Sequence, residues 1–223
     1  MSLTELQERL GVEITPELLQ LAVTHSSYAY EKGGADNERL EFLGDSILGY
    51  LVAVSVFKEH SELSEGELTK LKNAVVSAQA LATAATQLEL GKYLRLGKGE
   101  ARTDGRKKTN VLADAFEAIL GAAYLSSGME SARSIVERFV LPLLENPDAI
   151  REMADPKTSL IEKAQKLNLG DVRYEVEGEG PDHQMIYTAK CFVGSKLVAQ
   201  GQSSTKRSAE TEAAIAALKL LSN

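Results

Sequence analysis

Two acidic residues stand inside an otherwise apolar helical segment between about residues 110 and 127, and they limit the folds open to this chain. Asp114 and Glu117 are three positions apart, so on a helix they share one face. Their neighbours are apolar or small: Val111, Leu112, Ala113, Ala115, Phe116, Ala118, Ile119 and Leu120. We expect such a helix to lie in a core, where like charges are costly unless paired or bound to metal. The pattern therefore predicts a partly buried acidic pair that needs a counter-charge.

A second group of acids lies in the stretch Asn37-Glu38-Arg39-Leu40-Glu41-Phe42-Leu43-Gly44-Asp45-Ser46. Glu38, Glu41 and Asp45 have the i, i+3, i+7 spacing that places them on one helix face. Hard oxygen ligands without nearby His or Cys favour Mg²⁺, with Mn²⁺ as a substitute, and no organic cofactor is expected. Four to six converging carboxylates exceed what one magnesium ion takes, and they suit two metal ions about 4 Å apart, an arrangement that hydrolyses phosphodiesters.

Other interpretations of these acids are open at this point. A solvated acidic face would account for Glu38 and Glu41, although it fits Asp114 and Glu117 poorly. An internal salt-bridge network is also possible, with basic partners at Arg39, Lys70 or Lys72. Glu65 follows Ser64 in the capping-box pattern Ser64-Glu65-Gly66-Glu67, where the helix dipole favours any acid.

Charge and composition restrict the partners and the compartment. The net charge is −7, and residues 1–155 carry −8 whereas residues 156–223 carry +1. A polyanion would bind only if the acids were neutralised, and divalent metal is a suitable neutraliser. Cys191 is a lone cysteine, which favours a reducing interior. With no secretion signal and no uninterrupted apolar run of membrane-spanning length, we expect a cytoplasmic protein without a membrane partner.

The order of secondary-structure patterns predicts two domains. Residues 1–146 carry helical patterns throughout and predict an all-α domain, residues 147–155 a linker, and residues 156–223 a small α+β domain. Alternation of Val172, Tyr174 and Val176 with charged residues predicts a strand. Two further strands are expected over 185–193 and 196–202, with helices over 158–167 and 205–221, giving the order α-β-β-β-α.

The stretch from Asn37 to Ser46 resembles the signature of the ribonuclease III family. The resemblance extends to residues 64–68 and 112–121, and the carboxy-terminal stretch is similar to that family's double-stranded-RNA-binding domain. It covers nearly the whole chain, with three motifs in the expected order.

This resemblance implies an endonuclease that cuts double-stranded RNA as a homodimer. Each subunit would cut one strand and leave 5′-phosphates, 3′-hydroxyls and short 3′ overhangs, in ribosomal-RNA precursors and structured messages. The implied metal ligands are Glu41, Asp45, Asp114 and Glu117, with Asp45 and Glu117 the most sensitive catalytically. Glu38 and Glu65 match outer acidic positions that assist metal or RNA. Phe42 matches an aromatic residue inserted into the partner subunit, although its spacing also fits an ordinary core residue.

The second domain is expected to grip the RNA duplex by shape and phosphates. Lys206 and Arg207 open the last helix, where basic residues make sense if a phosphate caps the helix end. Ser203, Ser204 and Thr205 can cap that helix or touch the same phosphate. The resemblance places His183 in a loop that enters the minor groove, although it also fits a plain exposed loop histidine. Further candidate groove contacts are Thr158, Glu162 and Gln165.

Two positions depart from the family pattern, and one basic loop precedes the second acidic helix. Ile161 stands where the family often has Gln, and Glu210 replaces the third base of the last-helix motif; both departures bear on RNA affinity and on the preferred contacts. The loop bases are Lys98, Arg102, Arg106, Lys107 and Lys108, and they either contact RNA phosphate or form a solubilising surface loop.

Two further functions are considered beside the nuclease. A non-catalytic RNA-binding scaffold would require loss of acids, and all six are present. A helical nucleotide phosphohydrolase would require His-Asp metal pairs, and of His25, His60 and His183 only His60 is followed closely by an acid, Glu62.

Overall fold

The computed structural model describes residues 2–145, 152, 155–180 and 185–221, and the chain divides into two units, Met1–Ile150 and Arg151–Asn223. The predicted linker, residues 147–155, lies mostly outside the described residues. Each unit has its own hydrophobic core.

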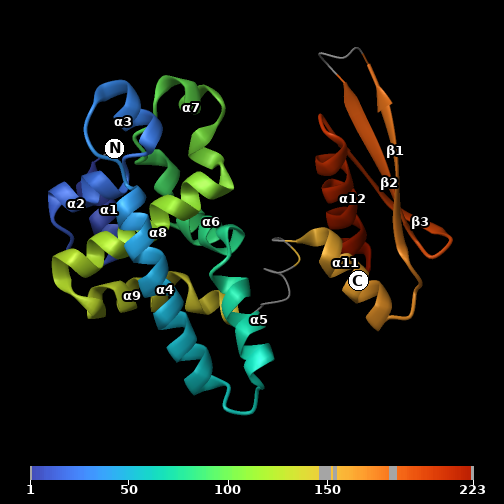
Figure 1. Cartoon of the computed structure of the whole chain (residues 1–223), viewed down its shortest axis with the longest axis horizontal. Coiled ribbons are helices and arrows are strands. Elements are labelled where there is room, and N and C mark those ends of the chain that lie inside the picture. Colours follow the sequence, from blue (N-terminus) through green and yellow to red (C-terminus); the bar gives the residue numbers. More distant parts are fainter. Residues whose placement is uncertain (1, 146–151, 153–154, 181–184, 222–223) are drawn as a thin grey trace. The chain divides into compact units, whose positions relative to one another are not determined.

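The first unit is helical, as expected (Figure 1). Its α-helices are α1 (Leu3–Leu10), α2 (Pro16–Ala22), α3 (Ser26–Lys32), α4 (Glu38–Glu59), α5 (Glu65–Val75), α6 (Ala78–Gln87), α7 (Lys98–Arg102), α8 (Thr109–Ser127) and α9 (Met129–Phe139). Short 3₁₀ turns are η1 (Leu90–Lys92), η2 (Gly105–Lys107) and η3 (Leu141–Glu145). The segment expected as a basic loop thus contains α7 and η2, because isolated turns of helix leave little periodic signal in sequence.

Helices α4 and α8 form the centre of this unit and carry the acids singled out above. α8 is buried on most of its circumference, packing on α4, α6, α2 and α9. Residues Leu40, Leu48, Val52 and Val56 of α4 are buried on the side that meets this core. The predicted start of α5 is confirmed, since the Ser64 N–H and hydroxyl donate to the Glu67 carboxylate at 2.9 and 2.6 Å in a capping box.

Helix α4 is also long and apolar enough, by length and composition alone, to cross a membrane. From the sequence we expected no membrane-spanning segment, because no uninterrupted apolar run is long enough. In α4 the apolar residues are interrupted by Glu41 and Asp45, so this helix did not meet that criterion. Because one side of α4 packs against α8 in a core of side chains from many helices, we interpret it as the central helix of a folded domain.

The second unit confirms the predicted α-β-β-β-α order. α11 (Pro156–Lys166) is followed by β1 (Val172–Glu179), β2 (Ile186–Val193), β3 (Lys196–Ser203) and α12 (Lys206–Leu221). The strands form an antiparallel sheet in the order β1-β2-β3, with Val172 opposite Val193 and Cys191 opposite Ala199. α12 packs on all three strands, and α11 packs on α12 and β1. As expected, Val172, Tyr174 and Val176 pack against the core.

Candidate active site on two helices

The backbones of α4 and α8 touch at two glycines. A Cβ atom on Gly44 would overlap the carbonyl group of Glu117, and one on Gly121 would overlap the carbonyl oxygen of Leu40. Both helices therefore need a residue without a side chain at the crossing. This crossing brings the acids of the two helices together.

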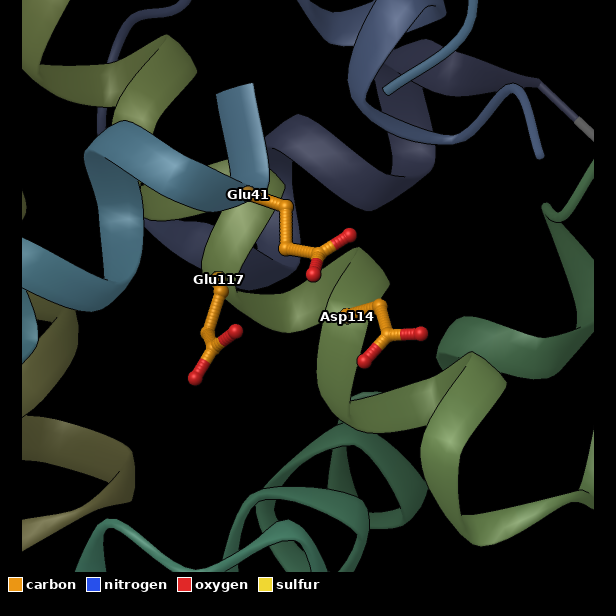
Figure 2. A group of neighbouring side chains, drawn as sticks. All are labelled: Glu41, Asp114 and Glu117. Carbon is orange, nitrogen blue, oxygen red and sulfur yellow. The ribbon is translucent and has the colours of Figure 1, made fainter. Parts of the chain in front are cut away.

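Three carboxylates meet beside the crossing. Glu41 of α4 and Asp114 and Glu117 of α8 each offer a carboxylate oxygen, and these oxygens all lie within 4.8 Å of one another. Figure 2 shows the Glu41 side chain extending from α4 toward the two acids of α8. All three side chains are partly buried. Their neighbours Ala113, Phe116 and Ala118 are buried, as the apolar pattern of α8 predicts.

The electrostatics of the group are those of crowded, desolvated like charges. Burial, with added repulsion from Asp45, Glu41 and Asp114, raises the pKa of Glu117 to about 8. Burial also raises the pKa of Glu41, and Asp114, Glu38 and Asp45 add to that shift. Burial raises the pKa of Asp114, and the interaction with nearby His25 partly offsets this increase. The group therefore favours bound protons or a bound cation at neutral pH.

No Lys or Arg side chain that the structure describes neutralises this group. Within the part of the chain that the structure describes, no ion pair joins a Lys or Arg to Glu41, Asp45, Asp114 or Glu117. The salt-bridge interpretation with Arg39, Lys70 or Lys72 is thus not supported. Three carboxylate oxygens without a His or Cys ligand match the donor preference of Mg²⁺ or Mn²⁺, so the residues present fit a hard divalent cation.

The remaining acids differ in their distance from this group. Asp45 is exposed, one turn after Glu41 on α4, and close enough for its charge to raise the pKa of Glu117. Glu38 is exposed one turn before Glu41 and influences the pKa of Glu41. Asp45 and Glu38 therefore border the three-carboxylate group without belonging to it.

Glu65 does not join the group within one chain. Lys72 of α5 lies beside Gly49 of α4, and α5 runs antiparallel to α4 (Figure 1). Glu65 precedes Lys72 by seven residues, about 10 Å of helix, in the direction away from Asp45. Its carboxylate instead accepts a hydrogen bond from the Thr69 hydroxyl at 3.2 Å.

Two residues near the group carried no functional prediction. His25, whose charge influences Asp114, precedes α3, and its Nδ1 accepts a hydrogen bond from the Ser27 N–H at 3.1 Å. Asn37 is only 4% exposed, and its side-chain amide donates to the Ala22 carbonyl at 3.2 Å, which anchors the start of α4. An Asn before a helix usually indicates a cap, so the sequence offered no sign of this buried contact.

Phe42 points away from the core of its own chain, with 77% of its surface exposed. Tyr50 and Phe57 are also exposed, at spacings of eight and seven residues along α4. These spacings place the three aromatics along one side of the helix. The alternative that Phe42 is an ordinary core residue of this chain is therefore wrong.

The basic segment 98–108 is partly engaged with its own chain. Lys108 pairs with Glu100 at 2.8 Å and donates to the Thr103 hydroxyl, and Arg106 donates to the Gly91 carbonyl at 2.7 Å. Lys98, Arg102 and Lys107 make no side-chain hydrogen bond or ion pair with any residue that the structure describes. Local structure thus accounts for two of the five bases.

The candidate RNA contacts in the second unit lie on its two helices. Thr158, Glu162 and Gln165 are exposed, and their spacing places them on one face of α11. Lys206 and Arg207 are exposed in the first turn of α12, and Ser204 is exposed just before it. His183 lies outside the described residues. The Thr205 hydroxyl accepts a hydrogen bond from the Ser208 N–H at 3.1 Å, so Thr205 caps this helix.

The two positions that depart from the family pattern, Ile161 and Glu210, lie in different environments. Ile161 is partly exposed on α11. Glu210 pairs with Lys157 of α11, with Oε2 and Nζ 2.5 Å apart.

Two family models match the chain. A ribonuclease-III-like model matches residues 15–144, and a double-stranded RNA binding motif matches residues 156–221. Among curated relatives, ribonuclease 3 of Leifsonia xyli subsp. xyli is 49% identical over 98% of this chain and 92% of its own length. Ribonuclease 3 of Thermobifida fusca is 46% identical over 97% of this chain and 91% of its own length.

A solved structure matches the first unit. It is the nuclease domain of ribonuclease III from Campylobacter jejuni, described as having a region involved in dimer formation. It aligns with a TM-score of 0.59 and 36% sequence identity, covering 62% of this chain and 96% of that one.

Proposed function

The chain belongs to the ribonuclease III family of double-stranded-RNA endonucleases, and from this premise we propose that it cuts RNA duplexes by a two-metal hydrolysis at its acidic cluster. The observation that carries the proposal is the meeting of Glu41, Asp114 and Glu117, whose carboxylate oxygens lie within 4.8 Å of one another. Acids in this arrangement are costly unless cations neutralise them.

Each acid of the cluster has a proposed role. Glu41, Asp114 and Glu117 hold divalent cations, and exposed Asp45 completes the site from the solvent side, where RNA arrives. A pair of Mg²⁺ ions, or Mn²⁺ as a substitute, supplies charge neutralisation and water activation when bound. Glu38, at the border of the cluster, assists the binding of metal or RNA. The close contact at Gly44 keeps the acids of α4 and α8 at a fixed separation.

The reaction is hydrolysis of a phosphodiester. The oxygen of water bonds to phosphorus, the bond from phosphorus to the 3′ oxygen breaks, and that oxygen leaves with a proton. The products therefore carry a 5′-phosphate and a 3′-hydroxyl. In a homodimer each subunit cuts one strand, and offset cuts leave short 3′ overhangs.

We propose that α4 forms the dimer contact. Phe42, Tyr50 and Phe57 present exposed aromatic surface along one side of this helix, which water disfavours. The similar Campylobacter jejuni domain has a region involved in dimer formation. Glu65, remote from the cluster of its own chain, is assigned an assisting role toward RNA or metal.

The second unit is proposed to hold the duplex. Domains of this kind contact 2′-hydroxyls and phosphates over about 16 base pairs rather than a base sequence. Thr158, Glu162 and Gln165 would face the minor groove together with His183, and Ser204, Lys206 and Arg207 would face phosphate. In the first unit, Lys98, Arg102 and Lys107 would contact phosphate, because their side chains make no hydrogen bond or ion pair within the described residues. Arg106 and Lys108 remain engaged with the chain.

Ribosomal-RNA precursors and structured messages in the cytoplasm are the proposed substrates. They contain long base-paired segments, which suit recognition by duplex shape. Cys191, a buried free thiol, is compatible with a reducing compartment.

A cleavage assay tests the proposal. Perfect RNA duplex, single-stranded RNA and duplex DNA are each incubated with the protein in Mg²⁺ and in EDTA. We expect cleavage of RNA duplex only, in Mg²⁺ only, with ends that accept ligation as 5′-phosphates. Binding without cleavage would favour a non-catalytic scaffold, and full activity in EDTA would exclude the metal mechanism.

A further inference from the structure

Lys157, in the first turn of α11, pairs with Glu210, in the second turn of α12. The Lys157 Nζ lies 2.5 Å from Glu210 Oε2, and the two side chains are 37% and 25% exposed. The same Nζ lies 5.0 Å from the ring centre of Tyr174 on β1. The ion pair therefore occupies the junction of α11, β1 and α12.

Glu210 shares a face of α12 with two basic residues. It follows Lys206 by four positions and Arg207 by three, so it is placed to pair with either along the helix. Within the described residues, neither Lys206 nor Arg207 forms an ion pair with Glu210, and the Lys206 Nζ lies 5.8 Å from the ring centre of Tyr187. Lys157, from another helix, holds this carboxylate instead.

A second acid flanks the same junction. Asp155 caps α11 by accepting a hydrogen bond from the Thr158 N–H at 3.1 Å. Hydrogen bonds from Thr158 hold the pKa of Asp155 below its usual value, and the charges of Lys157 and Arg207 contribute. Lys157 is therefore paired with Glu210 and near enough to Asp155 for its charge to act on that acid, as does the charge of Arg207.

We propose that Lys157 is a positioning residue for RNA binding: it neutralises Glu210 and so keeps Lys206 and Arg207 available to phosphate. The inference rests on the proposed RNA-binding role of Lys206 and Arg207. Without Lys157, the carboxylate of Glu210 would repel phosphate at a separation shorter than a Debye length, or would pair with the bases of its own helix. The departure at Glu210 is thus compensated by a residue on α11.

A binding experiment on the full chain tests this role. All variants carry Glu117→Gln to prevent cleavage, and affinity for an RNA duplex of about 16 base pairs is measured by fluorescence anisotropy. The set is Lys157→Met, Lys157→Arg, Glu210→Gln and the double variant Lys157→Met with Glu210→Gln. Lys166→Met, an exposed lysine on the same helix, controls for the general loss of one positive charge.

We expect Lys157→Met to weaken binding about fivefold, the effect of one unscreened charge at short range. Lys157→Arg and Glu210→Gln should bind like the parent, and Lys166→Met should lose less than about twofold. The decisive result is the double variant, which should recover the parent affinity. If the ion pair acted only by stabilising the fold, the double variant would not recover the parent affinity, because it lacks the pair altogether.

Two results would overturn the inference: unchanged affinity in Lys157→Met, or a double variant as weak as Lys157→Met. The second would mean that Lys157 touches RNA or acts through the fold. Lys206→Ala with Arg207→Ala separates this failure from failure of the proposed RNA face. If that pair of substitutions leaves affinity unchanged, the face itself is wrong.

Discussion

Gly44 of α4 lies directly against the carbonyl group of Glu117 on α8, with no room for a side chain between them. A contact between backbones thus sets the spacing of the acidic cluster, because Glu41 and Asp45 flank Gly44 and Glu117 carries its own carboxylate into the group. Packing at the centre of the domain and chemistry at its surface depend on the same crossing.

Gly44→Ala should destabilise the first unit and abolish cleavage. The added methyl overlaps backbone, which cannot rotate away, so α4 and α8 must separate at a cost of about 1–3 kcal/mol or more. Chemical denaturation measures the loss. Gly66→Ala is the matched control, because beyond its chain neighbours and its own helix backbone no atom of the structure lies within 4 Å of its Cβ position. Its stability should be unchanged or slightly higher. Equal stability of Gly44→Ala and its parent would contradict the proposed role of the crossing.

Glu117→Gln and Asp45→Asn should each lower the cleavage rate by at least about a hundredfold while leaving duplex binding nearly unchanged. Each substitution removes a charge that holds cation and keeps the side-chain volume. Single-turnover cleavage and anisotropy, measured on the same preparations, separate the two effects. Glu130→Gln, an exposed acid on α9, serves as the control and should cleave normally. Loss of binding equal to the loss of cleavage would argue against a metal role.

The metal-free protein should lose stability as pH rises from about 4.5 to about 8. Folding raises the pKa of Glu117 from 4.5 to about 8, so in this range the folded state keeps a proton that the unfolded state has released. The contribution of protonated Glu117 to folding stability is fully present below pH 4.5 and is lost as the pH rises to about 8. Melting temperatures in EDTA across this range provide the test.

Glu117→Gln should flatten that pH profile, since glutamine does not titrate. Mg²⁺ added at pH 8 should restore stability to the parent and have a smaller effect on the variant. A parent profile that rises between pH 4.5 and 8 would contradict the burial and crowding of this carboxylate.

Lys206→Ala with Arg207→Ala should weaken duplex binding and reduce its dependence on salt. Two lost phosphate contacts lower the slope of log affinity against log salt by about 2. Titrations at several salt concentrations give this slope. Lys219→Ala, in the last turn of the same helix, should leave the slope unaltered. An unchanged slope in the double variant would exclude phosphate contact at these residues.

Phe42→Ala should shift the protein from dimer to monomer without unfolding it. The side chain is 77% exposed in the chain, so its truncation leaves no cavity in the core. Sedimentation velocity measures the assembly, and thermal unfolding at low concentration checks the fold. Leu125→Ala removes an exposed apolar side chain from α8 as a control. A Phe42→Ala protein that remains dimeric would contradict the α4 interface.

Much of the architecture followed from local patterns. Apolar spacing predicted α4 and α8, and alternation from Val172 to Val176 predicted β1, because backbone hydrogen bonding in helices and strands repeats over short distances. The short helices α7 and η2 were not predicted, since one turn is too brief to show a period. Spacing alone also left the environment of Phe42 open between core and surface.

The residue types and their order determined the chemistry: acids at helical spacing, hard oxygen ligands, and an α-β-β-β-α unit after a helical one. Only the tertiary structure decided which acids meet. It brings Glu41 to Asp114 and Glu117, leaves Asp45 at the exposed border, and places Glu65 toward the other end of α4. The physical reason is that a repeating backbone sets which residues share a face, whereas the faces that touch are chosen by packing between segments far apart in the chain, here by the fit of Gly44 against Glu117.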